Sequence, residues 1–343
     1  MFTPRRVGRL GVPNRVVLSP MTRAQASDDG TPTDAMAKYY ARYATLGVGL
    51  LITEATYVDE AQSRAYFNQP GMANERHKAG WAAITEAVRR IGRPVILQLQ
   101  HGGRLAEPGL HSWAIGASGA KADGVSWQRA LPYAEAPVRA ATREEIKHIV
   151  ESFGRAAERA RAAGFDGVEI HGARGYLVDE FLSLPGASLE ERLTLPLAVV
   201  QAVRRAFPEG VVSYNWSLYK MTDALYQPPG GSEEVERIAR ALAEAGVDLV
   251  HVSTRDLTRV EAFGEPFARA VRRAIPATAL ILNGGIRKLE DAERTLKEMK
   301  ADFVAIARAL LANPDWVERA TKGLPLREFV RGMEHQPLLQ TFM

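Results

Sequence analysis

The sequence predicts a (β/α)8 barrel, in which eight parallel strands close into a cylinder and helices cover its outside. Short apolar runs alternate with amphipathic helical patterns along nearly the whole chain. The runs are almost continuously hydrophobic, as strands buried on both faces are. The 343 residues suit one such barrel with insertions, so we expect a single domain over residues 1–343.

The first element expected is a hairpin between Arg5 and Arg15, with Gly11-Val12-Pro13-Asn14 as its turn, placed to plug the bottom of the barrel. The eight expected strands are Val16–Ser19, Leu50–Thr53, Val95–Leu99, Gly167–Ile170, Val211–Trp216, Leu249–Val252, Ala279–Leu282 and Phe303–Ile306. The expected helices are Asp34–Thr45, Asn74–Ile91, Arg143–Ala163, Leu189–Phe207, Glu233–Ala245, Glu265–Ala274, Leu289–Met299 and Pro314–Lys322.

Helix starts carry their own signals. Thr142 with Glu145 predicts a capping box before the third helix. Ser232 predicts a simple N-cap before the fifth helix. The segment Gly102–Ala141 is too long for a plain connection, so we expect a lid or excursion there. Phe329–Met343 carries several apolar residues and is expected to pack on the cleft or on a neighbouring subunit.

A doubly wound sheet is the competing α/β layout, and it usually shows a glycine-rich dinucleotide turn after its first strand. Here the first strand is followed by Pro20-Met21-Thr22-Arg23, which contains no glycine. The nearest match, Gly47-Val48-Gly49, precedes its strand instead of following it. The barrel is therefore favoured.

Composition excludes several classes of protein. Hydrophobic residues make up 46% and charged residues 24%, so a large core is expected and disorder is not. No cysteine is present, which rules out disulfides, thiolate chemistry and cysteine-ligated metals; we expect no metal site. The net charge is +4, without a dense basic run, so nucleic acid is not an expected partner. Lacking a signal core or a membrane span, the chain is expected to be cytoplasmic and free of membrane contact.

The most informative stretch follows the fourth strand. His171 comes directly after Gly167–Ile170, Arg174 follows three residues later and Tyr176 five residues later. Loops after barrel strands form the reactive face. This loop is therefore expected to bring a hydrogen-bond donor, a cation and a phenol to one cleft.

A phosphate signal follows the last two strands, in Asn283-Gly284-Gly285-Ile286-Arg287 and in Ala307-Arg308. Loops seven and eight of barrels often bind phosphate, and glycines let backbone N–H groups approach an anion, helped by the N-terminus of the next helix. The alternative is that the glycines only turn the chain and Arg308 pairs with a carboxylate.

Hydrogen-bonding groups that would suit a flat heterocycle end the first three strands. They are Ser19-Pro20-Met21-Thr22, Glu54-Ala55-Thr56 and Gln98 within Leu97-Gln98-Leu99-Gln100-His101. Each of these motifs alone is weak evidence for a ligand site, because a buried glutamine usually has its hydrogen bonds satisfied within the protein.

Together with further stretches, these motifs resemble the Old Yellow Enzyme family of FMN-dependent ene-reductases from about Phe2 to Trp316. The markers are Pro13–Arg23, Gly49–Glu54, Gln98–Arg104, Ala163–Leu177, Asn283–Arg287 and Ala301–Asp315.

The resemblance implies roles for individual residues. His171 would bind the substrate carbonyl, with Arg174 as a second candidate for that contact, and Tyr176 would deliver a proton to the alkene carbon. FMN would be bound by Ser19, Pro20, Met21, Thr22, Ala55, Gln98, Asn215, Asn283, Gly284, Gly285, Ala307 and Arg308.

The implied reaction is hydride transfer from NADPH or NADH through FMN to an activated C=C bond, in a ping-pong pattern. Substrates would be small electrophilic alkenes, namely α,β-unsaturated carbonyl, imide or nitro compounds. Donors fixed at the carbonyl oxygen would stabilise its developing charge. The protein would be a monomer or homodimer.

Three departures from the family pattern matter. Arg174 stands where the family usually has Asn or a second His, and Asn215 where it has Arg on strand five. After Ser183 the chain is shorter, which should widen or reshape the cleft. One hypothesis is that Arg174 restores the positive charge near the flavin or the substrate carbonyl. Alternatively, it points outward to Asp179 or Glu180.

Other functions place different demands on the same residues. A second enzymatic alternative is a dienoyl-thioester or ring-modifying relative; the larger versions carry an iron–sulfur site, and the lack of cysteine argues against those. A phosphate-binding isomerase or aldolase would need a lysine or carboxylate in the barrel, for which Lys220, Glu54 and Glu169 are the candidates. A non-catalytic flavin carrier would bind FMN without oxidising NAD(P)H.

Overall fold

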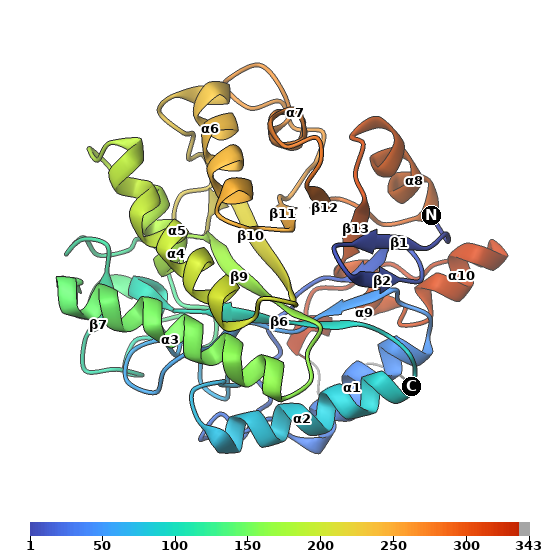
Figure 1. Cartoon of the computed structure of the whole chain (residues 1–343), viewed down its shortest axis with the longest axis horizontal. Helices are drawn as coiled ribbons and strands as arrows, with labels where there is room; N and C mark the ends of the chain where they lie inside the picture. Colours follow the sequence, from blue (N-terminus) through green and yellow to red (C-terminus); the bar gives the residue numbers. More distant parts are fainter. Residues whose placement is uncertain (336–343) are drawn as a thin grey trace.

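The structure is a computed structural model that describes residues 1–335. Eight parallel strands form a closed barrel, because the last pairs with the first, and helices surround it (Figure 1). The barrel strands are β3 (Val16–Leu18), β4 (Leu50–Ile52), β6 (Val95–Gln100), β9 (Gly167–Arg174), β10 (Val211–Lys220), β11 (Leu249–Ser253), β12 (Ala279–Asn283) and β13 (Phe303–Ile306). The predicted fold class is confirmed, and each predicted strand has its counterpart.

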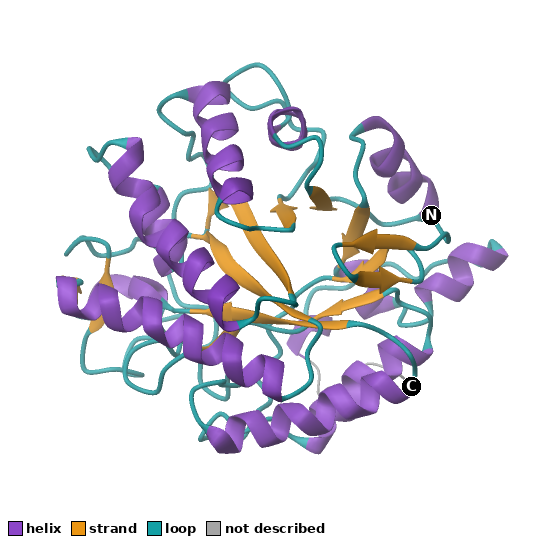
Figure 2. Ribbon diagram, viewed as in Figure 1, coloured by secondary structure: helices purple, strands orange, loops and turns teal. Residues whose placement is uncertain are grey.

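The predicted helices are present too, within a few residues of their expected ends (Figure 2). They are α1 (Asp34–Thr45), α2 (Glu75–Arg90), α3 (Arg143–Ala162), α5 (Leu189–Ala206), α6 (Gly231–Glu244), α7 (Phe267–Ala274), α8 (Leu289–Glu298) and α10 (Trp316–Lys322). Two short helices were not predicted, α4 (Leu177–Leu182) and α9 (Arg308–Ala312). No helix in residues 1–335 has both the length and the hydrophobicity that a membrane crossing needs.

One capping prediction is confirmed and the other is wrong. Thr142 and Glu145 form the expected capping box at the start of α3. At α6 the helix begins at Gly231, so Ser232 lies inside its first turn. The Ser232 hydroxyl donates to Glu265 Oε1 at 2.8 Å instead of capping the helix. The Ser232 hydroxyl thus bonds to a residue distant in sequence instead of to the first backbone N–H groups of α6.

The interior of the barrel is apolar at the bottom. Val17, Leu50 and Phe303 belong to one buried cluster that also contains Val7 and Val12. The last two come from the hairpin of β1 (Arg5–Val7) and β2 (Leu10–Val12), which lies against the barrel strands near the N-terminus in Figure 1. The hairpin therefore closes the bottom of the barrel, as predicted. Its predicted turn is wrong: the chain turns at Gly8-Arg9, whereas Gly11 and Val12 pair with Arg6 and Arg5 as part of β2.

Towards the carboxyl ends of the strands the interior becomes polar. Inward positions alternate with outward ones, so the same strands that supply the apolar floor also supply Gln98, Glu169, Ser213 and His251. These side chains hydrogen-bond to one another, which removes most of the cost of burying them. The polar layer sits directly beneath the reactive face.

Two strands run further than predicted. β9 continues from Ile170 to Arg174 and β10 continues from Trp216 to Lys220, with a register shift between Trp216 and Lys220. The Arg174 N–H donates to Ser217 Oγ at 3.0 Å, and Lys220 pairs opposite Arg174. His171 and Arg174 are thus held on a strand that projects past the barrel rim, rather than on a loop.

The long segment 102–141 is an excursion with structure of its own. It contains η1 (Gly103–Leu105), β7 (Ala114–Gly116), η2 (Tyr133–Glu135) and β8 (Val138–Ala140). Leu105, Ala122 and Tyr133 from this segment pack in one buried cluster with Tyr66 and Tyr176. The excursion therefore covers one side of the reactive face.

Candidate active site

The phosphate signal lies at a cavity of about 650 Å³ between the loops after β12 and β13. Gly284 and Gly285 line it, with φ angles of +151° and +73° that only glycine adopts readily. A Cβ at Gly284 would come within 2.8 Å of the Thr254 carbonyl oxygen. Arg308 also lines the cavity and forms no ion pair with any residue in the described part of the chain. A cation and a glycine turn therefore face the same space.

The helix after the glycines contributes less to an anion site than the sequence suggested. α8 begins only at Leu289, and its capping N–H groups at Arg287 and Lys288 already donate to Asp291 Oδ2. These N–H groups are occupied, so an anion here would depend on the glycine backbone and on the cationic side chains that line the cavity, which are Arg287, Lys288, Arg308 and Arg327. The alternative that Arg308 pairs with a carboxylate is not what the structure shows.

Asn283 and Ser19, both predicted to bind cofactor, contact each other. Asn283 Nδ2 donates to the Ala305 carbonyl oxygen at 2.9 Å and lies 3.4 Å from Ser19 Oγ. These bonds join the ends of β12, β13 and β3. Asn283 still lines the 650 Å³ cavity, so it both braces the strands and borders the site.

Met21 and Thr22 border a second cavity, of about 570 Å³, together with Ala307 and Arg308. The loop that carries them is anchored by Glu54, whose Oε2 accepts from the Arg23 and Ala24 N–H groups at 2.9 and 2.8 Å. Burial raises the pKa of Glu54 to about 7, against the lowering effect of those hydrogen bonds. Ala55, beside it, is buried. The loop after β3 is thus placed beside Ala307 and Arg308, which follow β13.

Gln98 and Asn215 present amides at the top of the barrel interior. Gln98 Nε2 donates to Glu169 Oε1 at 2.8 Å, while its Oε1 has no partner among residues 1–335. Asn215 is only 3% exposed, and its amide likewise forms no hydrogen bond within the described chain. Two polar groups are therefore left available towards the reactive face.

His171 and Tyr176 lie together, with ring centroids 4.9 Å apart in an edge-to-face arrangement. Both are nearly buried, at 8% and 4% exposure. His171 Nδ1 has no hydrogen-bond partner among the described atoms. Burial, with a smaller contribution from the positive charge of Arg174, lowers the pKa of His171 to about 3 against the raising effect of Glu169, so the imidazole is neutral.

The Tyr176 hydroxyl faces Met221. It contacts the Met221 sulfur at 3.5 Å, which is a weak acceptor. Burial raises the pKa of Tyr176 above its ordinary value, so the phenol keeps its proton at neutral pH. A neutral acid thus stands beside a neutral imidazole.

Arg174 does not point outward to Asp179 or Glu180. Its Nη2 donates to Ser253 Oγ at 2.6 Å at the end of β11, and its guanidinium lies 5.1 Å from the Tyr219 ring. Its φ of +68° is unusual for a residue with a side chain. The guanidinium reaches from β9 past β10, the strand that carries Asn215, and ends at β11.

The groups that an isomerase or aldolase would need are already engaged. Lys220 forms a buried ion pair with Asp179, and Glu169 accepts three hydrogen bonds inside the barrel. Glu54 holds the loop after β3. None of the three is free to act on a substrate.

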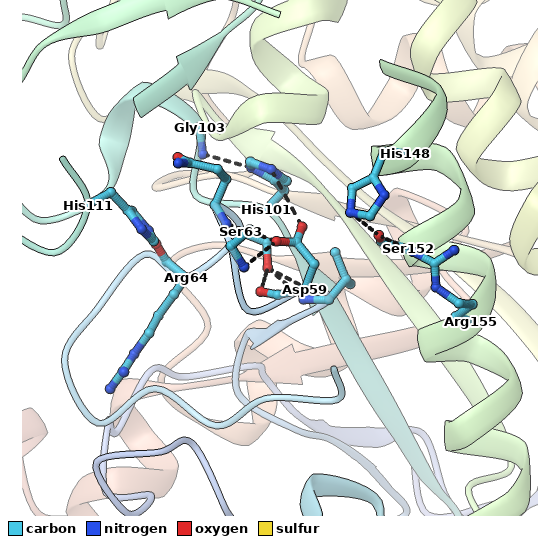
Figure 3. Close-up of polar contacts among 12 residues, drawn as sticks. Asp59, Ser63, Arg64, His101, Gly103, His111, His148, Ser152 and Arg155 are labelled. Carbon is cyan, nitrogen blue, oxygen red and sulfur yellow. Dashed lines mark hydrogen bonds and ion pairs between the residues drawn. The ribbon is translucent and has the colours of Figure 1, made fainter. Parts of the chain in front are cut away.

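His101 is a loop anchor, as the sequence suggested. Its Nδ1 accepts from the Gly103 N–H at 3.2 Å, and its Nε2 lies 4.0 Å from Asp59 Oδ2 (Figure 3). Its carbonyl oxygen accepts from the Leu177 N–H at 3.2 Å. Burial lowers the pKa of His101 to about 4. The described residues contain no cluster of the kind that binds a metal ion.

Sequence reasoning missed Met221, Ser253 and the pairing of Glu169 with His251. Glu169 was a candidate inside the barrel, and the period-2 alternation along β11 would have placed His251 there too. No sequence signal links Met221 to Tyr176 or Ser253 to Arg174. Those contacts depend on how three strands end in space.

Comparison with known proteins gives a consistent result. Residues 1–327 match the family described as NADH:flavin oxidoreductase / NADH oxidase. The NADH oxidase of Thermoanaerobacter brockii is 31% identical over 94% of this chain, which spans about half (51%) of that relative. Chanoclavine-I aldehyde reductase of Penicillium roqueforti is 34% identical over 98% of this chain and 93% of its own length.

The fold matches as well. The structure of the old yellow enzyme homologue from Zymomonas mobilis superposes with a TM-score of 0.89 and 26% identity. The match covers 99% of this chain and 97% of that one.

Proposed function

Because this chain belongs to the Old Yellow Enzyme family of NADH:flavin oxidoreductases, an FMN-dependent family that takes electrons from NADH or NADPH, we propose that it is an ene-reductase. Its substrates would be small α,β-unsaturated carbonyl, imide or nitro compounds. His171 would bind the carbonyl oxygen and Tyr176 would be the proton donor. NAD(P)H and the alkene would use the same cleft in turn.

The residues present suit FMN at one end of the cleft. The cavity beside Gly284, Gly285 and Arg308 offers backbone N–H groups and an exposed cation to a phosphate. At the other end, Gln98 Oε1 and the Asn215 amide have no protein partner in residues 1–335, which suits the polar edge of a flat ring. When bound, FMN supplies the hydride that it has taken from NAD(P)H.

His171 is suited to hold the substrate oxygen. A neutral imidazole has one N–H to donate, and the low pKa keeps His171 neutral throughout the physiological range. Its unpartnered Nδ1 shows that the protein itself does not use up the ring's hydrogen-bonding capacity. A donor at this oxygen stabilises the negative charge that develops there, typically by a few kcal/mol.

Tyr176 is suited to give the proton. Among residues 1–335 its hydroxyl is held only by a weak contact to Met221, so a substrate can replace that contact. The raised pKa keeps the proton on the phenol until charge develops on the substrate. The packing of Tyr176 against His171 is the observation that carries this proposal, because it puts an acid beside a carbonyl-binding donor.

Arg174 would supply the positive charge that strand five lacks. Asn215 is neutral, and the Arg174 guanidinium lies above the same part of the barrel, free of any carboxylate in the described chain. A guanidinium there can donate paired N–H bonds to a flavin carbonyl or to a substrate oxygen. A carboxylate or nitro group on the substrate would meet the same charge.

The test uses separate half-reactions under anaerobic conditions. The visible flavin absorption of the purified protein should bleach when NADPH or NADH is added and return when 2-cyclohexenone follows. A flavoprotein that bleaches but does not recover with any enone, maleimide or nitroalkene would contradict the ene-reductase proposal. A colourless protein that takes up no added FMN would contradict the cofactor assignment as well.

Arg174→Ala and Arg174→Lys separate the roles of Arg174. If the paired N–H groups of the planar guanidinium are required, both variants should slow reoxidation by enone or weaken FMN binding. Lysine should restore little of the lost function, because it carries the charge without the paired donors. Unchanged FMN affinity and unchanged half-reactions in Arg174→Ala would remove Arg174 from the site.

A further inference from the structure

The polar layer beneath the reactive face is centred on Glu169. This carboxylate accepts from Gln98 Nε2 at 2.8 Å on one oxygen. Its other oxygen accepts from Ser213 Oγ at 2.7 Å and from His251 Nδ1 at 3.0 Å. All four side chains are buried, and they come from four adjacent strands, β6, β9, β10 and β11.

A carboxylate can only accept, and this fixes the state of each neighbour. Gln98 must turn its NH2 group down towards Glu169, so its carbonyl Oε1 is the atom left for a ligand. His251 must carry its proton on Nδ1. The orientation of the Gln98 amide is therefore decided by the charge on Glu169, not by Gln98 itself.

The charge on Glu169 depends in turn on His251. Full burial favours the neutral acid, which could donate its own proton to Gln98 and let the amide rotate. Burial raises the pKa of Glu169, but His251, Ser213 and Gln98 together lower it by more, so that it lies below its ordinary value. Within the described chain His251 is the basic side chain that hydrogen-bonds to Glu169. His171, two residues further along β9, interacts with Glu169 through charge without forming a hydrogen bond to it in residues 1–335.

We propose that His251 is a positioning residue for the cofactor: through Glu169 it holds the Gln98 amide with its carbonyl oxygen facing the ligand, which selects an N–H donor such as the imide of a flavin ring. This inference rests on the proposed placement of the flavin ring near Gln98. His251 itself is fully buried and does not reach the reactive face.

The test is a competition between FMN and 3-methyl-FMN, which lacks the imide N–H, on the full-length protein. Wild type should prefer FMN. His251→Leu removes the Nδ1–H donor, frees the Gln98 amide to rotate and should lower that preference by about tenfold. Glu169→Gln, whose amide can both donate and accept, should lower it similarly.

His251→Asn is the matched control, because its amide can place a donor near the position of Nδ1. It should keep the preference for FMN. A double-mutant cycle with Gln98→Leu then tests the route: the effect of His251→Leu should vanish when Gln98 is already absent. Thermal unfolding of each variant reports any loss of stability separately.

The outcomes are distinct. Reduced preference in His251→Leu and Glu169→Gln, retained in His251→Asn and absent in the Gln98→Leu background, supports the proposal. An unchanged preference in a folded His251→Leu protein, or an equal effect with and without Gln98, overturns it. A wild-type protein that binds neither flavin would contradict the proposed function instead.

Discussion

At the β12–β13 end of the reactive face, a cavity is lined by the glycine backbone and an exposed arginine, Arg308. At the β9–β10 end of the same face lie the side chains of His171 and Tyr176, which are almost fully buried. The first end depends on backbone conformation and on a charge that solvent can screen. The second depends on packing: the excursion after β6 covers Tyr176, and the segment directly after β10 supplies Met221. We infer that the first end should govern cofactor affinity and the second the chemical step.

Tyr176→Phe should give the largest effect, because it removes the acid and leaves the packing almost unchanged. Enone reduction should fall by about 10²- to 10⁴-fold. Flavin reduction by NADPH and FMN content should stay as in wild type. Stopped-flow measurement of the two half-reactions checks this, and a parallel loss of FMN would break the division between the two ends.

Gly284→Ala should weaken FMN binding by roughly 10- to 100-fold, because strain at such a position costs ~1–3 kcal/mol and the new Cβ meets the Thr254 backbone. Gly285→Ala is the matched comparison. It shares a positive φ, but the nearest atom to its Cβ is 3.8 Å away, so its effect should be smaller. Equilibrium titration with FMN measures both, and equal losses would show that φ alone decides.

Arg308→Gln should weaken FMN binding by about fivefold at low salt, which corresponds to ~1 kcal/mol. Because Arg308 is exposed, the difference from wild type should shrink as ionic strength rises. The Tyr176→Phe defect, at a buried site, should not change with salt. A salt-independent Arg308→Gln effect would mean that the two ends are less different than proposed.

A further expected effect is a pH dependence of the free energy of unfolding, which is measured apart from ligand binding and catalysis. The folded-state pKa of His171 is about 3, below the ordinary 6.5, so an unfolded chain binds its proton more readily. The stability from this group is complete above about pH 6.5 and is lost as pH falls, by at most ~1.4 kcal/mol per pH unit. Unfolding curves of wild type and His171→Gln should therefore converge as pH falls from 7 to 5. Parallel curves would show that His171 is not held neutral.

The order of the elements was predictable from the sequence because each signal is local. The strand runs, the helix periods and the Thr142 capping box depend on neighbours within a few residues, and all appear in the structure. Ser232 shows where local prediction fails. Its sequence position predicted a helix cap, but its hydroxyl instead donates to Glu265, which lies beyond the next strand. The short helices α4 and α9 were not predicted either, because a helix of five or six residues is too short to show a recognisable hydrophobic period.

The candidate site likewise has features that follow from local sequence and others that depend on tertiary contacts. By itself the sequence determined the barrel, the glycine turn beside Arg308 and the presence of His171 and Tyr176 on one strand end, because each follows from short-range pattern. Tertiary structure alone decided that Arg174 reaches Ser253 and that His251 pairs with Glu169. Those contacts join strands about 80 residues apart, and their geometry follows from the length and register at which β9, β10 and β11 end together.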